Sequence, residues 1–333
     1  MIIVENYTLA VILCILAMIC WGSWQNTQNL AGKSWRFELF YWDFILGIVL
    51  FSLLMAFTFG SMGQAGRSFV TDLKQASAGS LFSAALGGAI WNLGTLLLVA
   101  AISVAGMSVA FPIGGGIGWI LGIAINYLGS PEGNPYLLFG GSLAIVVAIL
   151  FSMLAYRRLA HTQKKAPLQG IMLSFAAGLL IAFFYRFVAS ALDTSFSPET
   201  AGKITSYTAV VAFSAGALIS TLVFNPFFMR KPIQGEPVTF SGYFAGSSKT
   251  HFLGFLGGAI WCLGNSVSFM AVGSASPAIS YGLSNSAPVV AALWGIFVWK
   301  EFRDAPRGTD RLLWLMFLGY LIGLGLIVYA RIG

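Results

Sequence analysis

Residues 87–94 read Gly-Gly-Ala-Ile-Trp-Asn-Leu-Gly, and residues 257–264 read Gly-Gly-Ala-Ile-Trp-Cys-Leu-Gly. The two stretches are identical at seven of eight positions and lie 170 residues apart, about half the chain. Such a match could arise by chance in so apolar a chain. The copies, however, occupy matching places, the third and the eighth, in a series of apolar runs. We therefore predict an internal duplication.

Apolar runs long enough to cross a membrane fill most of the chain. A spanning helix needs about 20 mainly apolar residues. The runs lack strict alternation and are rich in Leu, Ile, Phe and Ala, which predicts helices and not barrel strands. The sequence therefore predicts an all-α polytopic membrane protein with ten transmembrane helices. Their approximate limits are Tyr7 to Trp24, Leu39 to Phe59, Leu81 to Ile102, Met107 to Leu128, Tyr136 to Tyr156, Gly170 to Leu192, Ser206 to Phe228, Phe252 to Val272, Pro277 to Trp299 and Leu312 to Tyr329.

The duplication divides these helices into two halves. We expect a first five-helix repeat at residues 1–156, a basic cytoplasmic linker at 157–169 and a second five-helix repeat at 170–333. Because each half has an odd number of spans, the second copy enters the membrane from the opposite side, so the repeats are inverted. Inverted repeats with a binding site between the halves are a transporter architecture. A channel or a signalling receptor is the rival class.

Composition excludes several functional classes. Hydrophobic residues make up 58% of the 333 residues and charged residues only 9%, against roughly 45 to 50% and about 25% in soluble domains. Soluble enzymes and nucleic-acid-binding proteins are therefore excluded. The sequence contains no nucleophile elbow or phosphate-binding loop, and its two histidines and three cysteines lack metal-site spacing. We expect no catalytic residue, no metal and no cofactor.

The basic residues predict the orientation of the chain. Ten spans place both termini on one side, and the loops then form two sets. The set that contains the linker holds thirteen Lys and Arg residues, and the other set holds four. By the positive-inside rule the first set is cytoplasmic and both termini are outside. We expect a multi-pass protein of the inner (plasma) membrane, whose first run is a span and not a cleaved signal peptide.

Polar and aromatic residues near the middle of the spans are the first candidates for a binding site. Trp91 and Trp261 occupy equivalent positions in the repeat, and the amides of Asn92, Asn265 and Asn285 lie at similar depth. Tryptophan normally prefers the membrane interface. A matched pair at depth predicts an aromatic platform with hydrogen-bonding groups for a neutral polar solute. Alternatively, the two tryptophans fill space beside glycines that allow close helix approach.

A second polar and aromatic cluster lies at the cytoplasmic end of the first span. Trp21 and Gln25 belong to it and are further candidates for substrate binding, whereas an interfacial position explains Trp24. Tyr281, four residues into the ninth span, belongs either to the interfacial aromatic belt or to the site.

Three charged residues are candidates for ion coupling or substrate binding. Asp43 lies within the second span, where a buried carboxylate could bind and release a proton. It could instead pair with Lys33 or Arg36 at the interface. Arg186 lies inside the sixth span, so it binds either substrate or a carboxylate. Asp193 and Glu5 are the expected partners at the outer face, and Glu5 is the second candidate coupling group.

Several motifs together resemble the drug/metabolite transporter superfamily. They include the inverted halves, Trp-Lys-Glu-Phe at 299–302, and a Gly-x-x-Trp-x-x-Gly pattern that begins at Gly88 and again at Gly258. Within that superfamily the chain is similar to the glucose/ribose porter and L-rhamnose symporter group and to the ureide permeases. Residues 3–5, 57–60 and 125–128 resemble ureide permeases, whereas residues 106–110 with Pro112-Ile113 resemble sugar porters.

The resemblance implies a central cavity built by spans one to four and six to nine, with spans five and ten peripheral. It also implies secondary transport driven by an ion gradient. Plant ureide permeases carry a long central loop, and the short linker here favours the sugar-porter branch.

The sequence and the resemblance together predict a function. We expect a secondary active transporter that moves a small neutral polar solute, a monosaccharide, by alternating access coupled to a proton. The alternatives are a ureide or nucleobase permease, a metabolite exporter or exchanger, and coupling to sodium. The expected partners are the substrate, the coupling ion and the lipid bilayer, with no nucleic acid.

Overall fold

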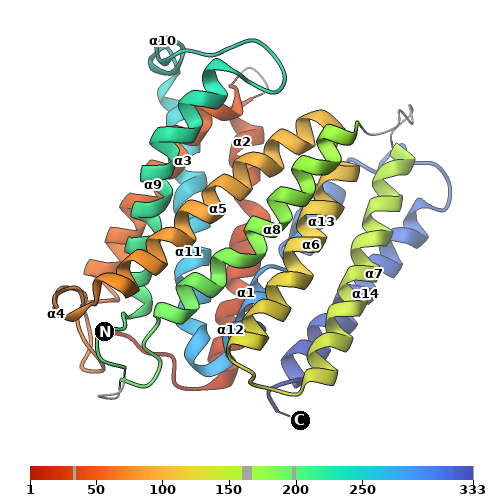
Figure 1. Cartoon of the computed structure of the whole chain (residues 1–333). Coiled ribbons are helices and arrows are strands. Elements are labelled where there is room, and N and C mark those ends of the chain that lie inside the picture. Colours follow the sequence, from red (N-terminus) through yellow and green to blue (C-terminus); the bar gives the residue numbers. More distant parts are fainter. Residues whose placement is uncertain (33–34, 160–166, 197–199, 333) are drawn as a thin grey trace.

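A computed structural model of the chain describes residues 1–32, 35–159, 167–196 and 200–332 (Figure 1). Within these ranges ten helical segments are long and apolar enough to cross a membrane. The prediction of an all-α polytopic protein with ten spans is therefore confirmed. The segments are Tyr7–Ala31, Phe37–Phe57, Ala78–Ala105, Pro112–Gly129, Pro135–Leu159, Leu168–Ala191, Ser206–Arg230, Ser248–Ala275, Pro277–Val298 and Thr309–Tyr329.

The helices keep the order of the predicted runs, and some spans contain more than one helix. Two short helices, α4 and α10, lie in loops and were not predicted. The elements are α1 (Tyr7–Ser23), α2 (Gln25–Ala31), α3 (Phe37–Phe57), α4 (Phe69–Gln75), α5 (Ala78–Ala105), α6 (Met107–Gly129), α7 (Pro135–Leu159), α8 (Leu168–Ala191), α9 (Ser206–Arg230), α10 (Phe240–Phe244), α11 (Ser248–Ala275), α12 (Pro277–Ser284), α13 (Pro288–Leu293), the π-helix η2 (Trp294–Val298) and α14 (Thr309–Tyr329).

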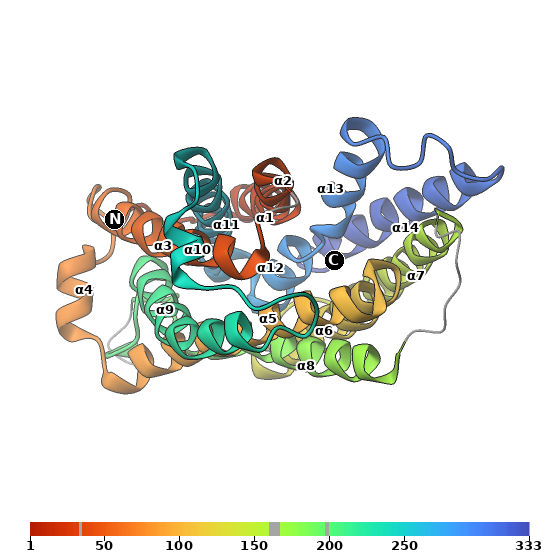
Figure 2. The ribbon, with the colours of Figure 1, turned by 90° about the horizontal axis from the view of Figure 1, so that it is seen from above.

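Both chain ends lie at the end of the bundle opposite to the one where α7 stops and α8 starts (Figure 1). We call the end where α7 stops and α8 starts the linker end, and the end that holds both termini the terminal end. Residues 160–166 of the predicted linker lie outside the described residues. Helices α7 and α14 pack together at one edge of the molecule, where Gly141 approaches the backbone of Gly323 (Figure 2). The remaining spans surround the centre.

Helices α5 and α11, which carry the duplicated motif, have closely matching local structure. Each contains 28 residues. Each is capped by a serine whose side chain accepts a hydrogen bond from a backbone N–H three residues later, Ser77 at α5 and Ser247 at α11. Each ends at a residue with positive φ, Gly106 at 81° and Ser276 at 79°. The matched starts and ends favour a duplication of the whole motif-bearing span.

The motif glycines bring helices into backbone contact. A Cβ atom at Gly88 of α5 would lie 2.0 Å from the carbonyl oxygen of Phe213 in α9, and one at Gly258 of α11 would lie 1.9 Å from that of Phe44 in α3. Only glycine allows such an approach. The two glycines are 170 residues apart and the two phenylalanines 169, close to the offset of the repeat, so the pair α5–α9 matches the pair α11–α3. This exchange of partners is what two related halves would give.

Proline breaks the ninth span but not the fourth. Helix α12 stops at Ser284, and α13 starts at Pro288, which has no N–H to donate to a carbonyl four residues earlier. The break divides the ninth span near its middle. Pro112, by contrast, lies inside α6, which continues to Gly129. The ninth span therefore provides free backbone groups at the centre of the bundle.

Candidate substrate cavity

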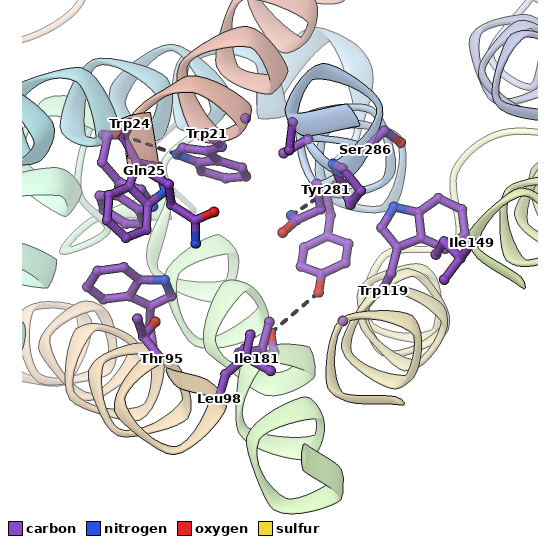
Figure 3. Close-up of a pocket in the computed structure, with 18 of the residues that line it drawn as sticks. Trp21, Trp24, Gln25, Thr95, Leu98, Trp119, Ile149, Ile181, Tyr281 and Ser286 are labelled. Atoms are coloured by element: carbon purple, nitrogen blue, oxygen red, sulfur yellow. Dashed lines mark hydrogen bonds between the residues drawn. The ribbon is translucent and has the colours of Figure 1, made fainter. Parts of the chain in front are cut away.

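A cavity of about 170 Å³ lies at the centre of the bundle (Figure 3). Both predicted halves of the chain contribute to it. The lining residues of α1, α5 and α13 belong mostly to the linker-end parts of those helices, so the cavity lies toward the linker end. The lining residues are Trp21, Gly22, Trp24, Gln25, Trp91, Thr95, Leu98, Val99, Ile102, Gly115, Trp119, Ile145, Ile149, Ile181, Phe184, Trp261, Tyr281, Asn285, Ser286, Ala287, Pro288, Ala291 and Tyr320.

Three tryptophans in ring contact, Trp21, Trp91 and Trp261, form one wall of the cavity. The ring centroids of Trp91 and Trp261 lie 4.0 Å apart, and those of Trp21 and Trp261 lie 5.8 Å apart with an angle of 19° between the rings. Nε1 of Trp21 donates a hydrogen bond of 3.1 Å to the backbone oxygen of Trp261, which ties α1 to α11. Flat aromatic faces of this kind suit a flat or ring-shaped solute.

Three polar side chains at the cavity can still form hydrogen bonds. Gln25, at the start of α2, is exposed and points its amide into the open centre (Figure 3). Asn285 donates to the backbone oxygen of Tyr281 at 3.1 Å, which leaves its own side-chain oxygen available. The hydroxyl of Tyr320 is buried and has no partner among the described residues. The cavity thus offers both donors and acceptors.

Tyr281 closes the cavity toward the terminal end. Its side chain is fully buried, and its hydroxyl donates to the backbone oxygen of Gly118 at 2.7 Å. A longer contact of 3.4 Å joins the same hydroxyl to the backbone oxygen of Ile181 (Figure 3). Trp119 makes a reciprocal bond, since its Nε1 donates to the backbone oxygen of Gly282 at 3.2 Å. Both bonds join α12 to α6. Tyr281 therefore contributes its ring to the lining, while its hydroxyl holds two helices together.

Six of the nine predicted substrate-binding residues line this cavity: Trp21, Gln25, Trp91, Trp261, Tyr281 and Asn285. Asn92 lies elsewhere, in the contact between α3, α5 and α9. Its side-chain oxygen accepts from the hydroxyl of Tyr41 at 2.6 Å, and its nitrogen donates to Ser220 at 2.8 Å. Asn92 follows Trp91 directly on a helix and therefore points about 100° away from it.

The other two predicted residues also lie outside the cavity lining. Asn265 is fully buried in α11, and neither atom of its amide has a hydrogen-bond partner among the described residues. Arg186 packs against Gly129 at the terminal end of α6, where a Cβ atom at that glycine would meet the guanidinium. No salt bridge within the described ranges includes Arg186.

Asp193, expected beside Arg186, pairs with Arg67 instead. Nη2 of Arg67 lies 2.7 Å from Asp193, and Nε of the same guanidinium lies 2.9 Å from Asp72 of α4. Burial acts to raise the pKa of Asp193, but hydrogen bonds from Thr200, Arg67 and the backbone of Phe196 lower it below its ordinary value. The cluster fastens α4 to the loop between α8 and α9.

The two predicted coupling residues occupy different parts of the molecule. Glu5 is exposed and lines a second cavity, at the terminal end. Asp43 is 6% exposed, and its carboxylate lies 2.8 Å from Nδ1 of His251 and accepts a hydrogen bond of 2.7 Å from Tyr243. Burial and the adjacent carboxylate raise the pKa of Tyr243, so its hydroxyl remains a donor.

The structure describes one of the two alternative partners predicted for Asp43. Arg36 forms its salt bridge with Glu38, at 2.5 Å. Lys33 lies outside the described residues. Asp43 thus joins α3 to α10 and to the start of α11, and it does not line the central cavity.

Several lining residues were not predicted from the sequence. Thr95 lies one helical turn after Trp91, and this spacing could have identified it. Ile145, Ile149 and Tyr320 come from α7 and α14, the fifth and tenth spans. These two spans lie at the edge of the molecule, as expected, but their inner faces contribute to the lining. Helices α3 and α9, spans two and seven, contribute none of the lining residues in the described ranges, although both were expected to build the cavity.

The model of the ureide permease family matches residues 40–166 and 153–330, which together cover most of the chain. The chain belongs to the ureide permease family. Ureide permease 1 of Arabidopsis thaliana is 23% identical to this chain, and the alignment covers 98% of each protein. Ureide permease 2 of the same plant is also 23% identical, over 96% of both. Probable ureide permease A3 of Vigna unguiculata is 22% identical, over 92% of this chain and 99% of that protein.

One solved crystal structure shows that the fold has been observed before. It superimposes with a TM-score of 0.60 at 15% identity and covers 98% of this chain and 99% of the other. The ureide permease part of the resemblance is thus established. The family match also favours the ureide alternative over the monosaccharide expectation, even though the linker here is short.

Proposed function

We propose that this protein is a secondary active transporter that moves a small, neutral, polar solute of the ureide class by alternating access. The observation that carries the proposal is the wall formed by Trp21, Trp91 and Trp261, with the amide of Gln25 pointing into the open centre beside it. Membership in a family whose curated relatives are named ureide permeases supports the substrate class and favours transport over catalysis.

The cavity lining favours an uncharged substrate. No Asp, Glu, Lys, Arg or His belongs to the lining formed by the described residues. A charged solute would lose its hydration there without gaining an opposite charge, which is costly. Allantoin, a cyclic ureide, is compact and uncharged, and it carries both N–H donors and carbonyl acceptors. Its N–H and carbonyl groups can form hydrogen bonds with Gln25, Asn285 and Tyr320, while its ring stacks on the tryptophans.

The position of the cavity favours the state of a transport cycle in which the site faces the linker end and is closed toward the terminal end. The lining belongs to the linker-end parts of α1, α5 and α13, and the bonds of Tyr281 and Trp119 hold the terminal end closed. In the opposite state those two bonds would break, because α12 would have to separate from α6. Movement of one half against the other is how inverted repeats alternate access.

Asp43 is our candidate for the coupling proton. Its carboxylate is buried and joined to His251, in the first turn of α11, and to Tyr243 of α10. An ionised carboxylate is costly to move through an apolar region, so protonation would change which state is preferred. Glu5, exposed at the terminal end, is the second candidate because it is accessible from that side.

Binding of named compounds to the purified, full-length protein tests the substrate class. Allantoin, uracil, glucose, ribose and rhamnose would each be titrated in a thermal-shift assay, since a ligand that binds only the folded state raises Tm by mass action. We expect allantoin to raise Tm and the three sugars to have no effect. A response to a sugar alone would refute the ureide assignment, and uptake of allantoin into proteoliposomes that never saturates would indicate a channel.

A further inference from the structure

A layer of buried hydroxyl groups joins α8, α11 and α12 on the terminal side of the cavity. The hydroxyl of Tyr185 lies 3.0 Å from Oγ of Ser268 and 2.9 Å from Oγ of Ser280. Oγ of Ser280 also donates to the backbone oxygen of Ser268 at 2.8 Å. Every hydroxyl in this layer therefore has a partner. The layer also fixes which positions of α11 and α12 face each other.

One turn nearer the linker end, the polar groups have no partners. Asn265 and Ser284 are both fully buried. Neither amide atom of Asn265 has a hydrogen-bond partner among the described residues, and Oγ of Ser284 has beside it the thiol of Cys14, which is a weak donor, and no well-aligned partner in the same ranges. Buried polar groups in folded proteins are nearly always paired, so a cluster of unpaired ones indicates a missing ligand or water.

The antiparallel packing of α11 and α12 places these groups on neighbouring helix faces, one turn beyond a pair that is in contact. Ser268 lies opposite Ser280, with their Oγ atoms 3.5 Å apart. Asn265 is three residues before Ser268, and Ser284 is four residues after Ser280, so each lies on the same helix face one turn further along. The thiol of Cys14, from α1, lies beside both Ser280 and Ser284. Three helices thus enclose the cluster.

The break in the ninth span adds a backbone acceptor to this cluster. Helix α12 ends at Ser284, and Pro288, four residues later, has no N–H with which to bond the carbonyl of Ser284. The C-terminus of a helix also carries partial negative charge. Two side-chain oxygens and one carbonyl, at a helix C-terminus inside a membrane protein, form a set of ligands that attracts a cation.

We propose that Asn265 and Ser284 bind a sodium ion at the break of the ninth span. Hard oxygen ligands suit alkali and alkaline-earth cations. No carboxylate belongs to the cluster, and no group of three or more acidic, His or Cys residues occurs in the described ranges, so a divalent ion would lack the anionic ligands it requires. Broken helices in other transporters bind Na⁺ through unwound carbonyls in this way.

The site lies next to the substrate cavity and is separate from Asp43. Asn285, which follows Ser284, lines the cavity. The next residue, Ser286, also lines it and is labelled in Figure 3. Gly264, which precedes Asn265, lies against the indole of Trp21, where a Cβ atom would meet Nε1 at 2.9 Å. An ion bound here would fix α12 relative to the tryptophan wall. Its role in coupling depends on the transport function proposed above, whereas its binding does not.

The test is a thermal-shift titration of the purified, full-length protein without substrate. NaCl replaces choline chloride at constant ionic strength, with KCl as a parallel series. We expect Tm to rise with the logarithm of Na⁺ concentration above the Kd, and to stay unchanged in KCl. Asn265→Ala and Ser284→Ala should each weaken Na⁺ binding about tenfold or more, because each removes an oxygen ligand.

Ser266→Ala is the matched control. Ser266 neighbours Asn265 and is equally buried, but its hydroxyl already donates to the backbone oxygen of Cys262 at 2.8 Å. This variant should keep the full response to Na⁺. Asn265→Asp retains side-chain oxygens and should keep the response too, which provides a second readout if Asn265→Ala does not fold. Equal Tm values in all three salts, or a Na⁺ response that survives both alanine substitutions, would overturn the proposal.

Allantoin added in the same experiment separates this proposal from the transport function. A Na⁺ response without an allantoin response would uphold the ion site and refute the ureide assignment. An allantoin response in choline chloride with no Na⁺ response would uphold the ureide assignment and refute the ion site.

Discussion

The indole rings of Trp91 and Trp261 lie with their centroids 4.0 Å apart, although the two residues are 170 positions apart in the sequence. They occupy the same position in the two copies of the repeated motif. Their meeting places one residue from each predicted half on the same cavity wall. A movement of one half against the other would change this contact, so the pair is suited to both binding and conformational change.

Replacing either tryptophan by alanine should weaken substrate binding. We expect a loss of about 1–3 kcal/mol in the binding free energy for Trp91→Ala and for Trp261→Ala, because each removes a stacking face. The measurement is the Kd for allantoin from thermal-shift titration. Trp314, which is 75% exposed on α14, is the matched control, and Trp314→Ala should bind normally. Unchanged affinity in both cavity variants would place the substrate elsewhere.

The sequence predicted the spans and much of the cavity wall because both depend on local patterns. Apolar runs identify helices, and the repeat identifies Trp91 and Trp261 as equivalent. Asn92 illustrates what such patterns miss, because a neighbour in sequence points to another side of the helix and there bonds Tyr41. Tyr320 could not be predicted, because which face of the tenth span turns inward is decided by packing between distant helices.

Substituting the motif glycine of α11 should destabilise the fold. A Cβ atom at Gly258 would lie 1.9 Å from the carbonyl oxygen of Phe44, so Gly258→Ala must push α11 and α3 apart. We expect the free energy of unfolding to fall by about 1–3 kcal/mol, seen as a lower Tm in detergent. Gly140→Ala is the control, since nothing lies within 4 Å of a Cβ atom there. Equal Tm values for the two variants would contradict the close approach.

The Arg67–Asp193 pair should make stability depend on pH at the acid side. The folded state holds the pKa of Asp193 below its ordinary value, through the bonds from Thr200 and Arg67 that outweigh burial. A lowered folded pKa stabilises the protein above the unfolded pKa, and this stabilisation disappears as pH falls through the folded pKa. The Tm of the unmodified protein should therefore decrease below about pH 5.

Asp193→Asn isolates this contribution. The variant should have a lower Tm at neutral pH, and its Tm should change less with acidification. If the unmodified protein and the variant lose stability in parallel as pH falls, the pair does not carry the pH dependence.

Labelling of single cysteines should determine the orientation. The three native cysteines are buried, so an impermeant maleimide should report mainly on introduced ones. Because thirteen basic residues lie on the linker side and four on the other, we expect Ile332→Cys to react on intact cells. Thr162→Cys, in the linker and outside the described residues, should react only after permeabilisation. The opposite pattern would reverse the proposed topology.

Asp43 provides the test of proton coupling. Asn at this position keeps the size and one acceptor for Tyr243 but cannot carry the negative charge that a proton neutralises. Asp43→Asn should therefore abolish accumulation of substrate against its gradient in proteoliposomes with an imposed proton gradient. Equilibrium exchange should remain, because the cavity lining does not include Asp43. Tyr243→Phe is the control for the local fold, since it removes a hydrogen bond to the same carboxylate without changing the charge. If Asp43→Asn still concentrates substrate under a proton gradient, the coupling proton is carried by another group, and Glu5, the second candidate, is the next residue to replace.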